Sequence, residues 1–385
     1  MSWQDGLVTD PLSDVSLSEL RSRQSVKWRM YEPDVLPLFV AEMDSALAPP
    51  VAAALTAAVE RGDTGYPHPG RFPAAFTAFA ERRYGWVVPS EPVLVADVMV
   101  GLMAALDEVC GPGDAVVVST PAYPPFFRNL ELSGRRLVSS PLKVSAEGFA
   151  LDLDRLEADF ASGAKAYLLC NPHNPCGLAY SRAELLAVAG LAERYGVRVV
   201  ADEIHAPLTM PGVGHVPFAS LDTEASALAY TAVSASKAWN LAGLKAALLV
   251  SGAACARPAS ARDLEEHVGH LGVLGGTAAF EEGEEWLDGL RAAIAVNAAW
   301  LGAELARRLP EVAYFPPRAT YLAWLDFRAL GLGDDPAEVL REKGRVALVP
   351  GLDFGAEGAG FARLNLATSP AILAEGVDRI VKAVR

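Results

Sequence analysis

Six short apolar runs between residues 93 and 252 constrain the fold of this chain more than any other feature of its sequence. Continuous apolar runs of this length are typical of strands that are buried on both faces of a sheet. Helical segments separate the runs, and such strand–helix–strand units predict an α/β fold with a mostly parallel sheet. In such a fold, ligands bind outside the carboxyl ends of the strands. The runs are VLVADVMV (93–100), AVVVST (115–120), AYLLC (166–170), VRVVA (197–201), ALAYT (227–231) and AALLVSG (246–252).

One of the connecting helices has clear signals at both ends. Ser181 and Glu184 have the spacing of a capping box, and Gly196 stands where a helix would end just before the next run. Further helices are predicted at 51–61, 72–84, 261–270 and 279–309.

The segments outside the central runs indicate a second, smaller unit. After Pro310 the sequence predicts short strands in YLAWLDF, VALVPG and FARLNLA, around one helix in DPAEVLREKG. A chain of 385 residues also exceeds the usual size of one domain. We therefore predict a large α/β domain over residues 48–275. A smaller α+β domain is expected from residues 276–385 together with an N-terminal arm, residues 1–47.

Charge and composition exclude several classes of function. The formal net charge of −14 repels phosphate backbones, so we expect no nucleic-acid partner. The four cysteines lie far apart without a C-x-x-C pair, which indicates reduced thiols and no metal site. No apolar stretch reaches membrane-spanning length, and the N-terminus has no signal-peptide core. We expect a cytoplasmic protein without a membrane partner.

The stretch TAVSASKAWNLAGLK (231–245) is where the chemistry is expected. Lys237 follows small hydroxyl residues and precedes Trp239, which suggests a partly enclosed amine. Enclosure disfavours the charged form of an amine, and a neutral lysine forms Schiff bases with aldehydes such as pyridoxal phosphate. A single lysine is usually a solvated surface charge, so the hypothesis needs partners elsewhere in the chain.

Three polar residues follow three of the predicted strands. Asn174 follows the run that ends at Cys170, Asp202 follows the run that ends at Ala201, and Lys237 follows the run that ends at Thr231. A pyridoxal cofactor needs an aldehyde partner, a carboxylate that keeps its pyridine nitrogen protonated, and a donor to its ring oxygen. These three residues supply such groups, although a strand-end acid such as Asp202 can also simply cap the next turn.

The phosphate and the substrate need further groups. Gly101 and Leu102 open a predicted helix after the run 93–100, and the N-terminus of a helix is an anion site. Ser234, Ser236 and Lys245 could add hydroxyls and a positive charge. Tyr123 could stack on the cofactor ring or belong to the core.

Arg363 is a charged residue within the apolar segment FARLNLA. Its guanidinium group suits a substrate carboxylate, or it could pair with an acid of the protein.

Together these motifs resemble the fold-type I pyridoxal-phosphate enzymes of the class I/II aminotransferase superfamily. NPHNPCG, ADEIH, SASKAWNLAGLK and FARLNLA match in order and spacing over nearly the whole chain. Within that superfamily the chain most resembles the MalY/PatB group of cystathionine β-lyases. This narrower resemblance is carried by VKW, LPLFVAEMD, TPAYPPFF, DEIH, NLAGLK and ATYLAWLDF.

The resemblance implies a role for each candidate residue. Lys237 would be the Schiff-base lysine and proton shuttle, Asp202 would contact the pyridine nitrogen, and Asn174 would contact the ring oxygen. Tyr123 would stack on the ring, and Arg363 would bind the substrate carboxylate. Gly101, Leu102 and Ser234 would hold the phosphate.

Other positions imply the assembly and the reaction. Tyr66 matches a tyrosine that reaches the neighbouring subunit's phosphate, which implies a homodimer with shared sites. His205 and Lys245 stand where many aminotransferases have a tyrosine and an arginine, and the histidine favours the lyase group. Glu42, Ser45, Pro207 and Trp239 depart from the pattern of the lyase group, and we expect these departures near the substrate side.

The leading hypothesis is a carbon–sulfur β-lyase that converts cystathionine or cysteine S-conjugates into pyruvate, ammonia and a thiol. An aminotransferase of class I/II is the alternative, because it would share every cofactor contact. A regulator that keeps this domain as a sensor would need a DNA-binding module. We expect none, because the N-terminal arm leaves no room for one and the net charge has the wrong sign.

Overall fold

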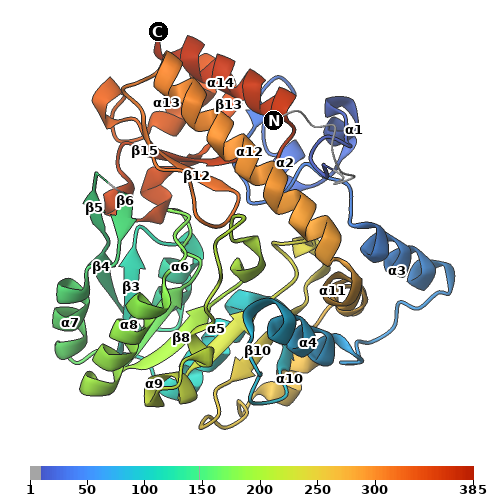
Figure 1. Cartoon of the computed structure of the whole chain (residues 1–385), viewed down its shortest axis with the longest axis vertical. Helices are drawn as coiled ribbons and strands as arrows, with labels where there is room; N and C mark the ends of the chain where they lie inside the picture. The colour runs from blue at the N-terminus through green and yellow to red at the C-terminus, as the bar shows by residue number, and fades with distance from the viewer. Residues whose placement is uncertain (1–9, 147) are drawn as a thin grey trace.

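The computed structural model describes residues 10–146 and 148–385, which form a seven-stranded sheet, a four-stranded sheet and two sheets of two strands each. Figure 1 shows their arrangement. The larger sheet has seven strands in the order β2-β10-β9-β8-β7-β3-β4. Its strands are β2 (Val93–Val95), β3 (Ala115–Thr120), β4 (Arg136–Pro141), β7 (Ala166–Cys170), β8 (Arg198–Asp202), β9 (Tyr230–Val233) and β10 (Ala247–Ser251).

The larger sheet is mostly parallel, as the sequence predicts. Strands β4, β3, β7, β8 and β9 pair in parallel, and only β10 runs antiparallel to its neighbours β9 and β2. The predicted capping box is also confirmed. Helix α8 (Arg182–Tyr195) begins after Ser181, whose side chain accepts a hydrogen bond from Glu184 N, and it ends at Gly196 in the left-handed region.

Both faces of the larger sheet are buried, which explains the continuous apolar runs. Val117 of β3 packs into a cluster with α7 (Leu153–Ala161) and α8. Its neighbours Val116 and Val118 point to the opposite face, into a cluster with α5 (Val98–Val109) and α6 (Pro124–Leu132). Alternate residues of one strand therefore face different helices, so neither face needs polar residues.

The run 93–100 is not the single strand that the sequence predicts. Strand β2 ends at Val95 and helix α5 begins at Val98. Asp97 separates the two elements, because its side chain accepts a hydrogen bond from Val100 N at 3.0 Å and so caps the helix. Val98 begins a helix and is buried against the sheet, whereas Val100 is 38% exposed.

The predicted helices at 261–270 and 279–309 also have different boundaries in the structure. The chain forms α10 (Ala261–Glu265), α11 (His270–Glu282) and α12 (Glu284–Arg308), with a break at Gly283. A Cβ atom at Gly283 would lie 2.5 Å from Nε1 of Trp239, and that Nε1 donates a hydrogen bond to the Gly283 carbonyl at 3.0 Å. The break is thus set by a contact with a distant residue.

Strands β11 (Ala313–Tyr314), β12 (Leu322–Asp326), β15 (Phe361–Asn365) and β14 (Val349–Pro350) form the smaller sheet. The same C-terminal part of the chain contains helices α13 (Pro336–Gly344) and α14 (Pro370–Val384). The sequence predicts only the first of these two helices. In Figure 1 the long helix α12 runs from beside α11 towards this smaller sheet.

The N-terminal arm joins this smaller part of the molecule. Strand β1 (Leu36–Pro37) pairs in parallel with β13 (Val346–Ala347). The first nine residues of the predicted arm lie outside the described residues, and the division into residues 48–275 and the remainder stays a prediction. The remaining α-helices and strands of the described residues are α1 (Leu17–Ser22), α2 (Val26–Arg29), α3 (Pro49–Glu60), α4 (Phe72–Tyr84), β5 (Lys143–Ser145), β6 (Gly148–Ala150) and α9 (Glu224–Ala227).

Within the described ranges, none of the helices combines the length and the apolar composition needed to cross a membrane.

Candidate active site

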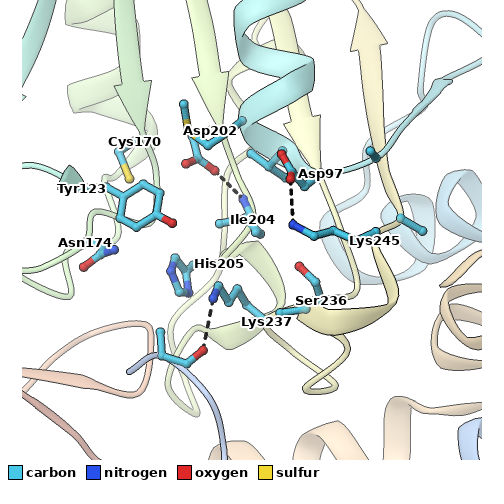
Figure 2. Close-up of a pocket in the computed structure, with 16 residues that line it drawn as sticks. Asp97, Tyr123, Cys170, Asn174, Asp202, Ile204, His205, Ser236, Lys237 and Lys245 are labelled. Atoms are coloured by element: carbon cyan, nitrogen blue, oxygen red, sulfur yellow. Dashed lines mark hydrogen bonds and ion pairs between the residues drawn. The ribbon is translucent and has the colours of Figure 1, made fainter. Parts of the chain in front are cut away.

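A cavity of about 170 Å³ opens at the carboxyl ends of β3, β7 and β8. This is the edge at which the parallel topology predicts a ligand site. Figure 2 shows Lys237 and Lys245 reaching into this cavity from one side, with Tyr123 and Asn174 on the other. Of the residues predicted from sequence, the cavity is lined by Tyr123, Asn174, Asp202, His205, Ser236, Lys237 and Lys245.

Lys237 follows β9, and its side chain is largely enclosed by the protein. Its Nζ donates a hydrogen bond to the backbone carbonyl of Ala41 at 3.1 Å. Burial, followed by the nearby charge of Arg363, lowers the pKa of Lys237 to about 8. A substantial fraction of this amine is therefore neutral near physiological pH, which is what a nucleophile or a proton acceptor requires.

Asp202 is the last residue of β8 and lies on the cavity wall. Its Oδ1 accepts a hydrogen bond from the Ile204 N–H at 3.1 Å. Burial raises the pKa of Asp202 to about 7, and the charge of Lys237 opposes that rise. A buried carboxyl without an ion-pair partner is costly unless a cationic ligand group meets it, so Asp202 fits a protonated ring nitrogen.

Arg363 on β15 is buried and contacts Asn174 directly. Its Nη1 donates to Asn174 Oδ1 at 2.9 Å, and its guanidinium group lies 4.8 Å from the ring centre of Phe354. Among the described residues no carboxylate lies within ion-pair distance of Arg363, and its Nε has no hydrogen-bond partner. Burial lowers the pKa of Arg363 to about 10. Within the described part of the chain, Arg363 therefore does not form the ion pair with an acid that was the alternative.

His205 and Tyr123 complete the wall of the cavity. Burial, followed by the charges of Lys237 and Arg363, lowers the pKa of His205 to about 3, so its imidazole stays neutral. Its Nδ1 is buried without a partner. Burial raises the pKa of the Tyr123 hydroxyl, and the ring packs edge-on against Phe126 at a centroid distance of 5.5 Å.

The cavity meets helix α5 one turn earlier than the sequence predicts. Asp97, Val98 and Met99 line the cavity at the start of the helix, beside Lys245 and Ser236. The first N–H groups of a helix have no partner within it, so those of Val98 and Met99 are available to an anion.

The structure does not bring Gly101, Leu102 and Ser234 to the cavity wall. Gly101 lies against the sheet, where a Cβ atom would come 3.2 Å from the Val95 side chain, and Leu102 is fully buried in the core. The Ser234 hydroxyl donates to the Ala246 carbonyl and accepts from Ser236 N. It therefore holds two residues that line the cavity without lining the cavity itself. The prediction that Gly101 binds the phosphate is wrong, because this glycine allows close packing of α5 against the sheet.

Other predicted positions also lie away from the cavity. Tyr66 is 94% exposed on the loop between α3 and α4. Trp239 is fully buried against Phe79 and Phe280. None of the four departures from the lyase pattern, Glu42, Ser45, Pro207 and Trp239, lines the cavity.

Sequence reasoning missed Ala41 and the first residues of α5. Ala41 contributes only its backbone to the hydrogen bond with Lys237, so no side-chain motif could have indicated it. Asp97 had a usable signal, because an acid between an apolar strand and a helix is a common N-cap.

The chain is similar to known proteins over nearly its full length. The family model described as "Aminotransferase class I and II" matches residues 33–380. A cystathionine beta-lyase of Corynebacterium glutamicum is 38% identical, with 96% of this chain and 99% of that protein covered. The cystathionine beta-lyase PatB of Bacillus subtilis is 36% identical, with 94% and 97% covered.

A solved structure shares the same fold. Cystalysin from Treponema denticola, a structure that contains a pyridoxal 5'-phosphate cofactor, superposes with a TM-score of 0.89 at 26% identity. The alignment covers 98% of this chain and 99% of that one.

Proposed function

Because this chain belongs to the aminotransferase class I and II family, we propose that it binds pyridoxal 5'-phosphate and acts as a carbon–sulfur β-lyase. Its substrates are cystathionine or cysteine S-conjugates, and its products are pyruvate, ammonia and a thiol. The observation that carries the proposal is the pair formed by Lys237 and Asp202. A buried amine with a lowered pKa and a buried carboxyl with a raised pKa face one cavity.

The residues present fit the cofactor at each of its polar ends. Asp202 offers a buried carboxyl that a protonated ring nitrogen would satisfy. At the other end of the cavity, the N-terminus of α5 and Lys245 offer N–H groups and a cation to a phosphate. Lys237 offers the amine that would bind the aldehyde. When bound, pyridoxal phosphate withdraws electrons from the substrate's α-carbon and so weakens its bond to hydrogen.

The residues of this chain would then divide the work of elimination. Arg363 would hold the substrate carboxylate, and Asn174, which accepts a hydrogen bond from Arg363, would contact the ring oxygen of the cofactor. The neutral Nζ of Lys237 would take the α-proton, and the Ala41 carbonyl would keep the amine in place. The C–S bond breaks, the sulfur leaves with the electron pair as a thiolate, and water releases the amino group as ammonia to leave pyruvate.

We also propose that the protein acts as a homodimer. Tyr66 supports this assembly, because an aromatic side chain that is 94% exposed is a candidate for a contact with a second subunit. Sedimentation of the holoenzyme tests the assembly, and a monomer with full activity would contradict it.

Product analysis tests the reaction. The holoenzyme should release equal amounts of pyruvate and thiol from L-cystathionine, measured by lactate dehydrogenase coupling and a thiol reagent. An aminotransferase would instead convert the bound cofactor to its pyridoxamine form and release a keto acid that retains the sulfur. Protein that binds the cofactor but releases neither pyruvate nor thiol from a panel of such substrates would contradict the proposal.

A further inference from the structure

An acid and a base face each other where the cavity meets the start of α5. Lys245 Nζ lies 3.1 Å from Asp97 Oδ2, and both side chains line the cavity, as Figure 2 shows. The other carboxylate oxygen of Asp97 accepts the Val100 N–H at 3.0 Å. This cap leaves the N–H groups of Val98 and Met99 to a ligand, but it also fixes a negative charge beside them.

The backbone holds Lys245 in this place at a conformational cost. Its φ is +58°, in the left-handed region that residues other than glycine rarely adopt. The Lys245 carbonyl accepts a hydrogen bond from Gly269 N at 2.8 Å. A Cβ atom at Gly269 would clash with the Leu244 carbonyl, so these two segments are tightly packed. The packing of the start of α11 against this turn therefore fixes the backbone of Lys245, from which its side chain reaches Asp97.

The geometry limits how far a bound anion can lie from Asp97. An anion that accepts a hydrogen bond of about 2.9 Å from Lys245 Nζ must lie within about 6 Å of Asp97 Oδ2, since Nζ and Oδ2 are 3.1 Å apart. A phosphate monoester carries a charge of about −1.5 to −2 near pH 7. It would therefore meet a lysine whose charge is already balanced by a carboxylate, and it would be repelled by that carboxylate.

We propose that Asp97 weakens the hold of this protein on the cofactor's phosphate and raises the second pKa of that phosphate. The inference rests on the proposed function. Asp97 could also help binding by orienting Lys245, but ion pairs between partly exposed side chains contribute little. Lys245 and Asp97 are 58% and 39% exposed. The phosphate carries nearly twice the charge of a carboxylate, so we expect its repulsion by Asp97 to outweigh this small contribution. The site would then favour exchange of the cofactor over permanent retention.

Asp97→Asn tests the inference because it changes the charge and keeps the cap. The asparagine side-chain oxygen still accepts the Val100 N–H, so α5 keeps its start. The dissociation constant of pyridoxal 5'-phosphate is measured for the cofactor-free protein by equilibrium dialysis. We expect Asp97→Asn to bind about 10-fold more tightly than wild type at low salt, with a smaller gain at high salt. Lys245→Met should bind more weakly.

Pyridoxal without its phosphate is the matched control ligand. Its affinity should be the same for wild type and Asp97→Asn, which separates an effect on the phosphate from an effect on folding. The ³¹P chemical shift gives a second readout, and the phosphate of bound cofactor should titrate at a lower pH in the variant. Asp97→Ser, which also caps without charge, replaces Asp97→Asn if the latter does not fold.

The outcomes separate the two levels of the proposal. Equal or weaker binding of pyridoxal 5'-phosphate by Asp97→Asn, with pyridoxal binding unchanged, would overturn the inference alone. Failure of every form, wild type included, to bind pyridoxal 5'-phosphate would overturn the proposed function as well.

Discussion

Lys237 and Tyr321 donate hydrogen bonds to the same backbone oxygen. The Ala41 carbonyl accepts from Lys237 Nζ at 3.1 Å and from Tyr321 Oη at 2.9 Å. The segment that carries this carbonyl is held on its other side by Asn240, whose side chain bonds both N and O of Met43. The resting position of the candidate catalytic amine is therefore set by the N-terminal arm and the smaller sheet together.

Tyr321→Phe should lower the turnover number more than it changes substrate binding. The variant removes one donor to the Ala41 carbonyl and leaves the ring in place, so the carbonyl and the Lys237 amine become less fixed. A hydrogen bond of this kind contributes about 0.5–1.5 kcal/mol, so we expect a loss in kcat of about 3- to 10-fold with little change in KM. Steady-state kinetics on one substrate would measure both, and a change confined to KM would contradict this role.

The buried ion pair between Lys27 and Asp44 should be needed for stability. Lys27 Nζ lies 2.8 Å from Asp44 Oδ2, both side chains are fully buried, and the Trp28 Nε1 donates to the other oxygen. Lys27→Met leaves a buried carboxylate without its partner, which typically costs about 3–5 kcal/mol. Urea unfolding should show this loss. Lys27→Met combined with Asp44→Asn should recover part of it, because the unpaired charge is then absent.

Asp202 makes a prediction about the pH dependence of the cofactor-free protein. Burial raises the pKa of Asp202 from its ordinary value of 3.8 to about 7 in the folded state. The folded state therefore binds this proton more strongly than the unfolded state, so its stabilising contribution is complete below pH 4 and is lost as the pH rises to 7. Three pH units correspond to at most about 4 kcal/mol.

Urea unfolding of wild type and Asp202→Asn across this pH range would measure the effect. The free energy of unfolding of wild type should fall relative to that of the variant between about pH 4 and pH 7. Parallel curves would show that burial does not raise the pKa of this carboxyl.

Arg363→Met should impair the reaction without destabilising the fold. Removing a buried cation that lacks an acid partner should leave the free energy of unfolding unchanged or raise it by about 1 kcal/mol. Loss of a charged partner for a substrate carboxylate costs about 2–5 kcal/mol, so kcat/KM should fall at least about 30-fold. Arg363→Lys keeps the charge but loses the two-pronged geometry, so its kcat/KM should lie between those of wild type and Arg363→Met. A variant that loses both activity and stability would indicate a structural role.

The parts of this molecule that follow local rules were predictable from sequence. The apolar runs 115–120 and 166–170 are strands with the predicted bounds, and Ser181 caps α8 as expected, because consecutive residues carry the signal in each case. The cavity wall was also predictable where a polar side chain ends a strand, as Asp202 does, or lies in the loop after one, as Asn174 does.

What the sequence did not indicate depends on contacts between distant segments. The break at Gly283 follows from the indole of Trp239, and the acceptor for Lys237 is a backbone atom 196 positions away. Gly101 illustrates the opposite error, since a glycine near a helix start was assigned to a phosphate although it serves helix–sheet packing. The spacing of apolar residues and the helix-capping motifs are local signals, so they do not indicate contacts between distant segments.

Lys237 itself provides the most direct test of the candidate site, because two tasks are proposed for this one amine. It would hold the cofactor covalently, and it would move the α-proton of the substrate. Lys237→Ala should lose both, with a fall in activity of at least about 10²- to 10⁴-fold. The cofactor should still bind without a covalent bond, since Asp202 and the start of α5 are unchanged. Borohydride treatment of the wild-type holoenzyme should then leave a pyridoxyl group on the peptide that contains Lys237, detected by mass spectrometry. A pyridoxyl group on another lysine, or none on an active enzyme, would show that the assignment of this amine is wrong.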